Sequence, residues 1–290
     1  MRKINYLSYV EVNGTDNEDY IVNSGDEATL NGFGNDDGIE NSGVSVKIYG
    51  GDGHDVIFNE VEGGYAYIDG GPGIDSIKNA ADYATILGGE ADDILDNYGS
   101  SVVASGVDGH NLITTYGNTQ NVTIYGGIGD DAIHVGGFYS VVQANTGNDV
   151  INIAAGVVGN SVDAGDGNDF INVEGANHVI DGRGGDDYIY NEKGYDTTVV
   201  YGRGYGDDTI DSFYNDDLVV NLYNLTIDDV TGLAYEDVNG VYGVHIDVDD
   251  TDDELTVMYR SGGIENTTYR FGDGSRYGFD NQNQTFYKKD

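Results

Sequence analysis

The sequence predicts an all-β protein, a parallel β-roll or β-solenoid of about eleven coils with a C-terminal β cap. Three observations lead to this prediction. A unit of 18 to 21 residues repeats along the chain, apolar residues recur at fixed offsets within it, and 46 glycines among 290 residues disfavour long helices. Hydrophobic residues make up 38% of the chain, which is enough to form a core.

The repeat is clearest in a column of Asp residues, with one Asn. A hydrophobic residue follows each member by two positions, and a second apolar column precedes the members by seven, from Val12 to Tyr201. Residues alternate between apolar and polar around both apolar columns, which indicates short strands. Each repeat therefore reads as strand, Gly/Asp loop, strand and polar turn. The column comprises Asp19, Asp37, Asp55, Asp75, Asp93, Asn111, Asp131, Asp149, Asp169, Asp187 and Asp208.

Coils of this size cannot bury their apolar residues alone, so we expect neighbouring coils to stack in parallel and share a narrow core. Stacking places like residues above like and turns the hydrophobic column into a core ladder. It also predicts an Asn ladder four residues after the Asp column, at Asn23, Asn41, Asn59, Asn79 and Asn97.

Glycines recur at fixed places before the Asp column. Gly-rich turns allow backbone carbonyls to point inward beside the carboxylates, and Asn17, Asn35 and Ala91 replace the Gly two residues before the Asp. We expect the loop glycines to belong to the same site as the Asp residues. They are Gly50, Gly51, Gly53, Gly70, Gly71, Gly73, Gly88, Gly89, Gly109, Gly126, Gly127, Gly129, Gly147, Gly165, Gly167, Gly185 and Gly206.

The formal charge of −40, from 12 basic and 52 acidic residues, argues against direct binding of nucleic acid or an anionic membrane. Stacked carboxylates about 5 Å apart repel one another, and a divalent cation between loops would reverse that interaction. Calcium suits such a site because it takes oxygen ligands in loose geometry, whereas magnesium needs a tight octahedron. Eleven loops leave about ten gaps for ions.

Zinc is not expected. The chain has no Cys, and its five His residues are scattered without the spacing of zinc ligands. We expect all five to lie on the surface or in loops. They are His54, His110, His134, His178 and His245.

Three stretches, Gly50–Ile57, Gly70–Ile77 and Gly126–Ile133, carry the motif most fully. The sequence resembles the RTX, or haemolysin-type calcium-binding, repeat proteins over residues 14–212. The resemblance implies calcium ions between consecutive loops, held by the Asp side chains and loop carbonyls of both coils. Only one half of each coil carries the motif, so calcium is expected along one edge.

Two places depart from this family pattern. Asn111 is expected to weaken the central sites, because it stands where the other repeats have Asp. Arg203 and Tyr205 interrupt the last loop.

We expect three regions: an N-terminal cap at residues 1–13, the calcium-binding solenoid at 14–212 and a C-terminal β cap at 213–290. The last region resembles the C-terminal part of haemolysin-type proteins at Ile264-Glu265 and at Tyr269–Gly274, which implies an uncleaved signal for type I export. The N-terminus lacks the apolar stretch of a signal peptide, and no apolar run is long enough to span a bilayer. We expect a secreted or cell-surface monomer.

The expected role is structural or adhesive, with calcium as the bound ion and a glycan or cell-surface ligand as partner. The alternative is the calcium-binding C-terminal module of a secreted toxin or enzyme, of protease, lipase or alginate epimerase type, whose catalytic part is absent here. No catalytic motif of a serine hydrolase, P-loop enzyme or zinc protease occurs, so we expect no enzyme. The 24 Tyr residues suit strand faces or a sugar-binding platform.

Other acidic and polar residues are given plainer interpretations. Single Asp residues in turns can be solvated Asx-turns, an alternative that eleven stacked copies disfavour. The acids at Asp36, Asp92, Asp130, Asp186 and Asp207 are expected to be rim charge rather than direct ligands, and the run Asp247–Glu254 a solvated turn rather than another ion site. An ice-binding solenoid would need a flat Thr ladder, whereas Thr114, Thr115 and Thr123 are isolated.

Overall fold

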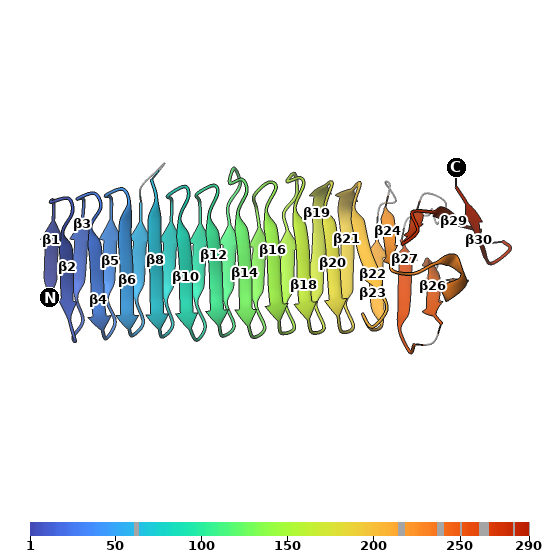
Figure 1. Ribbon diagram of the computed structural model, residues 1–290, viewed down its shortest axis with the longest axis horizontal. Helices are drawn as coiled ribbons and strands as arrows, with labels where there is room; N and C mark the ends of the chain where they lie inside the picture. Colours follow the sequence, from blue (N-terminus) through green and yellow to red (C-terminus); the bar gives the residue numbers. More distant parts are fainter. Residues whose placement is uncertain are drawn as a thin grey trace. The chain divides into compact units, whose positions relative to one another are not determined.

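The computed structural model describes residues 1–60, 64–213, 218–236, 241–249, 251–260, 267–280 and 282–289. It divides into two compact units, residues 1–146 and residues 147–290. Both units consist of β-strands, and the described residues contain no α-helix (Figure 1). No helix among them is long and apolar enough to cross a membrane. The Ile264-Glu265 pair of the C-terminal resemblance and Asp250 of the acidic run lie outside the described residues.

The first unit holds two parallel sheets, one formed by its odd-numbered strands and one by its even-numbered strands (Figure 1). Each pair of strands forms one coil. The odd-numbered strands are β1 (Arg2–Asn5), β3 (Tyr20–Asn23), β5 (Gly38–Asn41), β7 (Val56–Asn59), β9 (Ser76–Asn79), β11 (Ile94–Asn97), β13 (Leu112–Thr115) and β15 (Ala132–Val135). The even-numbered strands are β2 (Glu11–Thr15), β4 (Thr29–Gly34), β6 (Val46–Asp52), β8 (Ala66–Pro72), β10 (Thr85–Glu90), β12 (Val103–Asp108), β14 (Thr123–Ile128) and β16 (Val141–Thr146).

The second unit begins with the same arrangement and ends in antiparallel strands. One sheet comprises β17 (Val150–Ile153), β19 (Phe170–Ala176), β21 (Tyr188–Tyr195), β23 (Asp208–Ser212), β27 (Glu254–Tyr259), β26 (Tyr242–Val248) and β25 (Val230–Glu236) in this order. The other comprises β18 (Ser161–Asp166), β20 (Val179–Gly184), β22 (Thr198–Gly202), β24 (Val219–Tyr223), β28 (Thr268–Phe271), β29 (Arg276–Asp280) and β30 (Thr285–Lys288). The pairs β27–β26, β26–β25, β28–β29 and β29–β30 are antiparallel. A short 3₁₀ turn, η1 (Ile227–Asp229), precedes β25.

The two apolar columns form the core between the sheets. Ile39 pairs with Ile57 and Ile57 with Ile77, and all three are at most 1% exposed. Leu30 and Ile48 face them from the other sheet and are fully buried. Each such side chain contributes about 1.5–3 kcal/mol on burial. The predicted parallel β-solenoid is confirmed.

The apolar column was misaligned at its last member. The strand register places Val199, not Tyr201, beside Ile180. The final step of the repeat is 21 residues long. Two extra residues lie between Val199 and Asp208, so the core position falls two residues earlier than the fixed offset predicts.

Strand β1 extends the odd-numbered sheet before the first Asp loop. Its residues pair with β3 in the register of the repeats, with Ile4 beside Val22 and Asn5 beside Asn23.

The predicted Asn ladder is confirmed on the turn edge of the first unit. Each side-chain amide donates from Nδ2 to Oδ1 of the Asn in the next coil. The distances are 2.6 Å for Asn5–Asn23, 2.7 Å for Asn23–Asn41, 2.8 Å for Asn41–Asn59, 2.7 Å for Asn59–Asn79 and 2.9 Å for Asn79–Asn97. Most of these amides also bond to backbone groups two residues later, such as the Asn79 Nδ2 that donates to the Ala81 carbonyl at 2.8 Å.

His178 lies in a loop, as expected, but its side chain is not at the surface. Its side chain is fully buried between β19 and β20 rather than exposed. Nδ1 accepts the backbone N–H of Asn160 at 3.2 Å, and Nε2 lies 3.0 Å from the carbonyl oxygen of Glu174. Burial lowers the pKa of this imidazole. It is a buried polar side chain that joins neighbouring backbone segments.

Candidate metal centre

The Asp column lines the inside of the loops that join each even-numbered strand to the following odd-numbered strand. In the first unit, Asp37, Asp55, Asp75 and Asp93 are 1–3% exposed. One oxygen of each carboxylate, Oδ1, accepts the backbone N–H of the preceding member of the column. These bonds measure 2.7 Å from Asp19 to Asp37, 2.7 Å from Asp37 to Asp55, 2.7 Å from Asp55 to Asp75 and 2.8 Å from Asp75 to Asp93.

The second carboxylate oxygen lacks such a bond. Oδ2 of Asp37, Asp55, Asp75, Asp93 and Asp187 is buried and has no hydrogen-bond partner within the part of the chain that the structure describes. Buried polar atoms are normally paired, because an unpaired one costs about 1–3 kcal/mol and a charged one more. A positively charged partner would satisfy the same buried oxygen in each of these loops.

A glycine leaves room beside each of these oxygens. A Cβ on Gly50 would lie 2.2 Å from Asp55 Oδ2 and 2.4 Å from the carbonyl oxygen of Gly70. A Cβ on Gly70 would lie 2.3 Å from Asp75 Oδ2 and 2.5 Å from the carbonyl oxygen of Gly88. Carboxylate and carbonyl oxygens from neighbouring coils thus converge on the space that the missing side chain leaves.

Other loop glycines are required by backbone conformation. Gly51 and Gly53 have φ of 113° and 141°, in the left-handed region that favours Gly. A Cβ on Gly71 would also meet the carbonyl oxygen of Gly51 at 2.3 Å. Asn35 and Ala91 replace Gly at φ of 64° and 81°, as their place in the repeat predicts, whereas Asn17 does not adopt a positive φ.

Two bulky residues adopt the same left-handed conformation, which sequence reasoning missed. Phe33 and Val107 have φ of 84° and 83°, at the place that Gly51 has in its repeat. Such a conformation costs a β-branched or aromatic residue about 1–2 kcal/mol. The loops of these repeats therefore follow the same backbone path as the others, although Phe33 and Val107 disfavour the conformation that it requires.

Asn111 interrupts the row of carboxylates. Its Oδ1 accepts the N–H of Asp93 at 2.9 Å, which turns Nδ2 toward the space beside Gly106. Nδ2 donates to the carbonyl oxygen of Gly109 at 3.3 Å. An amide N–H₂ group cannot act as a cation ligand, so this loop offers one oxygen fewer than its neighbours.

In the second unit the column continues through Asp149, Asp169, Asp187 and Asp208, each at most 3% exposed. The same Oδ1 bonds measure 2.7 Å from Asp149 to Asp169, 2.9 Å from Asp169 to Asp187 and 3.0 Å from Asp187 to Asp208.

The last loop, between β22 and Asp208, also makes side-chain contacts that have no counterpart in the regular repeats described above. The buried hydroxyl of Tyr201 donates to the carbonyl oxygen of Gly206 at 2.9 Å. The guanidinium of Arg203 pairs with Asp229 at 2.7 Å and bonds to the Asp249 carbonyl at 2.6 Å. These contacts show how the departure from the repeat pattern at Arg203 is accommodated.

Burial makes the ionised form of the column unfavourable. Desolvation, which exceeds the repulsion from neighbouring carboxylates, raises the pKa of Asp55 and Asp93 to about 7 and that of Asp75 to about 6. The pKa of Asp187 rises to about 7 and that of Asp208 to about 9 for the same reason.

Asp19 is the exception in the column. The N-terminal ammonium lies 2.8 Å from its Oδ1, and this contact lowers the pKa of Asp19. A nearby positive charge therefore reverses the shift seen in the more deeply buried members.

A second ladder runs along the exposed rim of the loops, one residue before the Asp column. Asp36 Oδ1 accepts the N–H of His54 at 2.9 Å, and His54 Nδ1 accepts the N–H of Ile74 at 2.8 Å. Asp92 Oδ1 likewise accepts the N–H of His110 at 2.8 Å. Sequence reasoning missed this role, because Asp, Asn and His alternate at the position and share only an acceptor atom.

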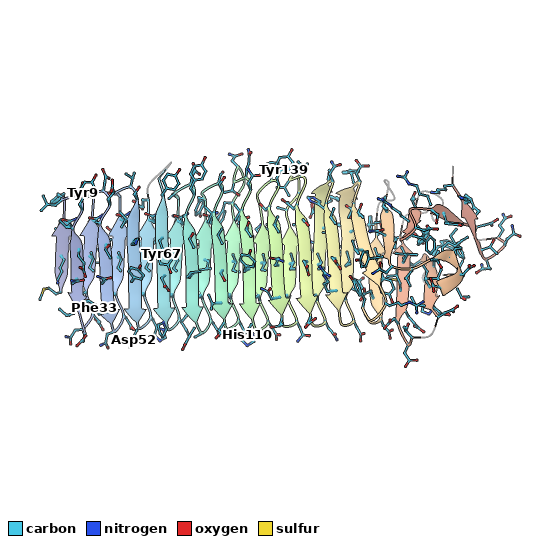
Figure 2. The ribbon with its side chains drawn as sticks, in the orientation of Figure 1. Tyr9, Phe33, Asp52, Tyr67, His110 and Tyr139 are labelled. Carbon is cyan, nitrogen blue, oxygen red and sulfur yellow. The ribbon has the colours of Figure 1, made fainter. Side chains whose placement is uncertain are left out.

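The loops and the turns of the first unit lie on opposite edges. Phe33, Asp52 and His110 project from the loop edge, Tyr9 and Tyr139 from the turn edge, and Tyr67 from the face between them (Figure 2). The buried atoms at the loop edge that could act as metal ligands are carboxylate and carbonyl oxygens. A hard cation takes six to eight such ligands, so the residues present fit an ion of this kind.

The comparisons with known proteins bear on the fold. No protein-family model matches the sequence, and a search of curated proteins also finds no match. Among solved structures, the chain is similar to the crystal structure of a hyperactive, Ca2+-dependent, β-helical antifreeze protein from an Antarctic bacterium. The TM-score is 0.55 at 17% identity, over 78% of this chain and 86% of the other. This similarity shows a shared β-helical fold.

Proposed function

We propose that this chain is a calcium-binding repeat protein of RTX type whose folding is coupled to calcium binding. The observation that carries the proposal is the row of buried Asp Oδ2 atoms at Asp37, Asp55, Asp75 and Asp93, which have no hydrogen-bond partner among the residues that the structure describes. Calcium would be held between consecutive loops by these oxygens and by loop carbonyls such as those of Gly70 and Gly88. When bound, it would supply the positive charge that buried carboxylates require.

The fold neighbour supports this assignment, because its crystal structure is described as Ca2+-dependent. The overall charge of −40 supports it as well, since a coil stack with ionised loops and no cation would repel itself. Binding free energy becomes folding free energy when the site does not exist in the unfolded chain. We propose residues 14–212 as the calcium-binding region, with residues 1–13 and 213–290 as its caps.

The proposed biological role is structural or adhesive, outside the cell and without catalysis. Paired aromatic rings on the turn edge support a glycan or cell-surface ligand. The rings of Tyr65 and Tyr83 stack at 5.2 Å between centroids, and those of Tyr98 and Tyr116 at 4.2 Å. All four side chains are 38–62% exposed. A glycan-binding screen tests this role, and absence of binding to any glycan in calcium would contradict it.

The alternative is a calcium-binding module of a secreted toxin or enzyme whose catalytic part lies elsewhere. Genes that encode an export apparatus beside this one, with a longer upstream reading frame, would support that alternative.

The antifreeze activity of the fold neighbour is not proposed for this chain. The outward residues of successive even-numbered strands are Thr29, Lys47, Tyr67, Thr85 and Val103, which stack on one another without a continuous Thr row.

Counting bound metal tests the proposal most simply. The full chain is equilibrated with calcium, passed through gel filtration and analysed for calcium by atomic emission. We expect several ions per chain, approaching the number of gaps between carboxylate loops. One ion or none would contradict the proposal.

A further inference from the structure

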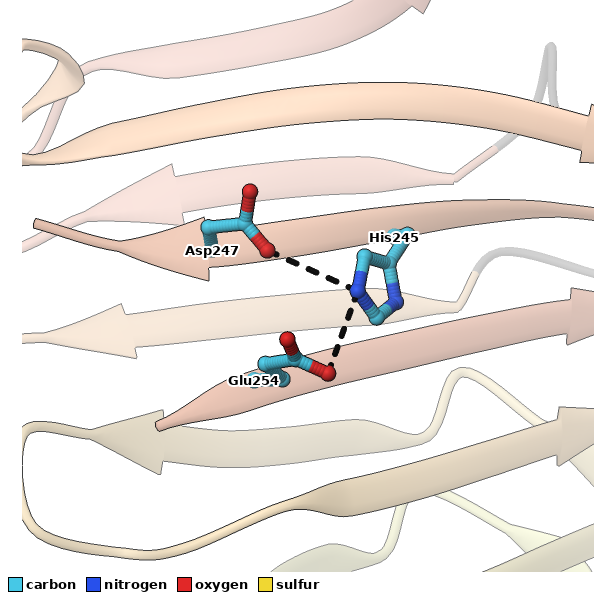
Figure 3. A group of neighbouring side chains, drawn as sticks. All are labelled: His245, Asp247 and Glu254. Carbon is cyan, nitrogen blue, oxygen red and sulfur yellow. Dashed lines mark ion pairs between the residues drawn. The ribbon is translucent and has the colours of Figure 1, made fainter. Parts of the chain in front are cut away.

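A histidine and two carboxylates meet on strands that carry no repeat loop. His245 and Asp247 lie on β26, and Glu254 begins the neighbouring strand β27 (Figure 3). Nε2 of His245 is 3.5 Å from Asp247 Oδ1 and 3.2 Å from Glu254 Oε2. One ligand atom from each residue lies within 4.8 Å of the other two.

The strand register forces this meeting. Asp247 stands directly opposite Glu254 in the antiparallel pair, and His245 stands opposite Thr256. Like charges directly opposite each other destabilise a strand pair, so a positive charge between the two carboxylates would stabilise this one.

Thr256 orients the imidazole. Its Oγ1 lies 3.0 Å from His245 Nδ1. When Nδ1–H donates to this hydroxyl, the lone pair of Nε2 faces the two carboxylates. Metal-binding histidines are held in this way, with the other ring nitrogen bonded to a second group that fixes the tautomer.

The distances suit a zinc-type ion. Bonds of about 2.0–2.2 Å in tetrahedral geometry place neighbouring ligand atoms about 3.3–3.6 Å apart. The separations of His245 Nε2 from the two carboxylate oxygens, 3.2 and 3.5 Å, are close to this range, and all three ligand atoms lie within 4.8 Å of one another. The side chains are 33–48% exposed, which leaves the remaining position open to water. An imidazole nitrogen favours zinc over calcium, which prefers oxygen alone.

We propose that His245, Asp247 and Glu254 bind a divalent transition-metal ion such as zinc, in a site separate from the calcium loops. The same three side chains could instead form an ion pair with a protonated imidazole. The two arrangements differ in whether added zinc binds through Nε2.

Zinc titration of the calcium-loaded full chain, followed by calorimetry, tests this site. Calcium in excess occupies the oxygen-only loops, and far-UV circular dichroism checks that each variant is folded. His245→Gln should weaken zinc binding more than about 100-fold, beyond the range expected for a supporting residue, and Thr256→Val about 10-fold. The matched control is His134→Gln, which changes an exposed His on β15 and should leave zinc affinity unchanged.

Equal zinc affinity in the wild type and in folded His245→Gln would overturn the proposal in favour of the ion pair. A second measurement needs no variant. In the nitrogen NMR spectrum of the wild type, zinc should shift Nε2 of His245 and leave Nδ1 protonated. A His245 signal that zinc does not change would also overturn the proposal.

Discussion

The two edges of the first unit differ in how their buried polar side chains are paired. Both bury a ladder of polar side chains, with Asn at the turns and Asp at the loops. Asn59 donates to Asn79, which donates to Asn97, so each neutral amide satisfies its neighbour. At Asp75 in the Asp ladder, Oδ1 is bonded, whereas Oδ2 is buried without a partner among the described residues.

This difference separates what the backbone stack provides from what it lacks. A side-chain amide carries a donor and an acceptor, so the amides of a column can satisfy one another's hydrogen bonds. An ionised carboxylate only accepts hydrogen bonds. A column of buried carboxylates therefore needs protons or a cation to balance its charge and to pair its oxygens. The turn edge should therefore be indifferent to calcium, and the loop edge should depend on it.

The largest effect is expected from Asp75→Asn. It removes the buried negative charge but keeps the shape and the Oδ1 acceptor, as Asn111 does naturally. In saturating calcium we expect a loss of about 3 kcal/mol in unfolding free energy, because a buried ionic contact is broken from one side.

The matched control for this variant is Asp52→Asn, at the exposed end of strand β6. It removes the same charge and should change the unfolding free energy by less than about 0.5 kcal/mol. Urea unfolding in calcium measures both variants, and equal effects would contradict the account.

Filling the glycine space should come next. Gly70→Val places a side chain against Asp75 Oδ2 and the Gly88 carbonyl, and overpacking of this kind costs about 1–3 kcal/mol. Gly117→Val is the control, since a Cβ there meets nothing within 4 Å. Calcium titration followed by circular dichroism should show a higher calcium midpoint for Gly70→Val alone. An unchanged midpoint would show that the space is not used.

Breaking the turn edge should have a different signature. Asn79→Ala leaves the amide of Asn59 and the Oδ1 of Asn97 without their partner, at a cost of about 2 kcal/mol. Because no ion is involved, the number of calcium ions bound to the folded variant should equal that of the wild type. Loss of a bound ion would show that the two edges are not independent.

Acid should partly replace calcium, with the smallest effect. Burial raises the pKa of Asp55 and Asp93 to about 7, above the unfolded value, so the calcium-free fold binds more protons than the unfolded chain. Its stability is therefore greatest below the unfolded pKa and is lost as pH rises through the folded pKa.

In calcium-free buffer, lowering the pH from about 8 to about 5 should increase the far-UV β signal. In saturating calcium the same change should weaken ion binding, because the ligands must be deprotonated. The same pH dependence in both buffers would contradict the role of the carboxylates.

Much of this architecture could be predicted from the sequence, because the repeat turns local patterns into long-range pairing. A hydrophobic column such as Ile39, Ile57 and Ile77 is buried when equivalent residues of successive coils pair in register. The same register aligns the Asn column. The prediction failed at Tyr201, where extra loop residues shift the register and a fixed offset no longer applies.

Features that depend on contacts between different strands could not be read from spacing. The buried position of His178 comes from packing between coils, not from its neighbours in sequence. His245 and Glu254 are nine residues apart in a stretch whose acids look solvated, and only the β26–β27 register brings them together. The three side chains that we propose as metal ligands come together across a strand pair and not along the chain.

The central claim, that the loop edge needs calcium to fold, is tested most directly by far-UV circular dichroism of the wild-type chain at neutral pH. The spectrum is recorded in millimolar calcium and again after excess EDTA. We expect a β-sheet spectrum in calcium that is lost in EDTA and recovered when calcium is restored. A β-sheet spectrum unchanged by EDTA would contradict the central claim.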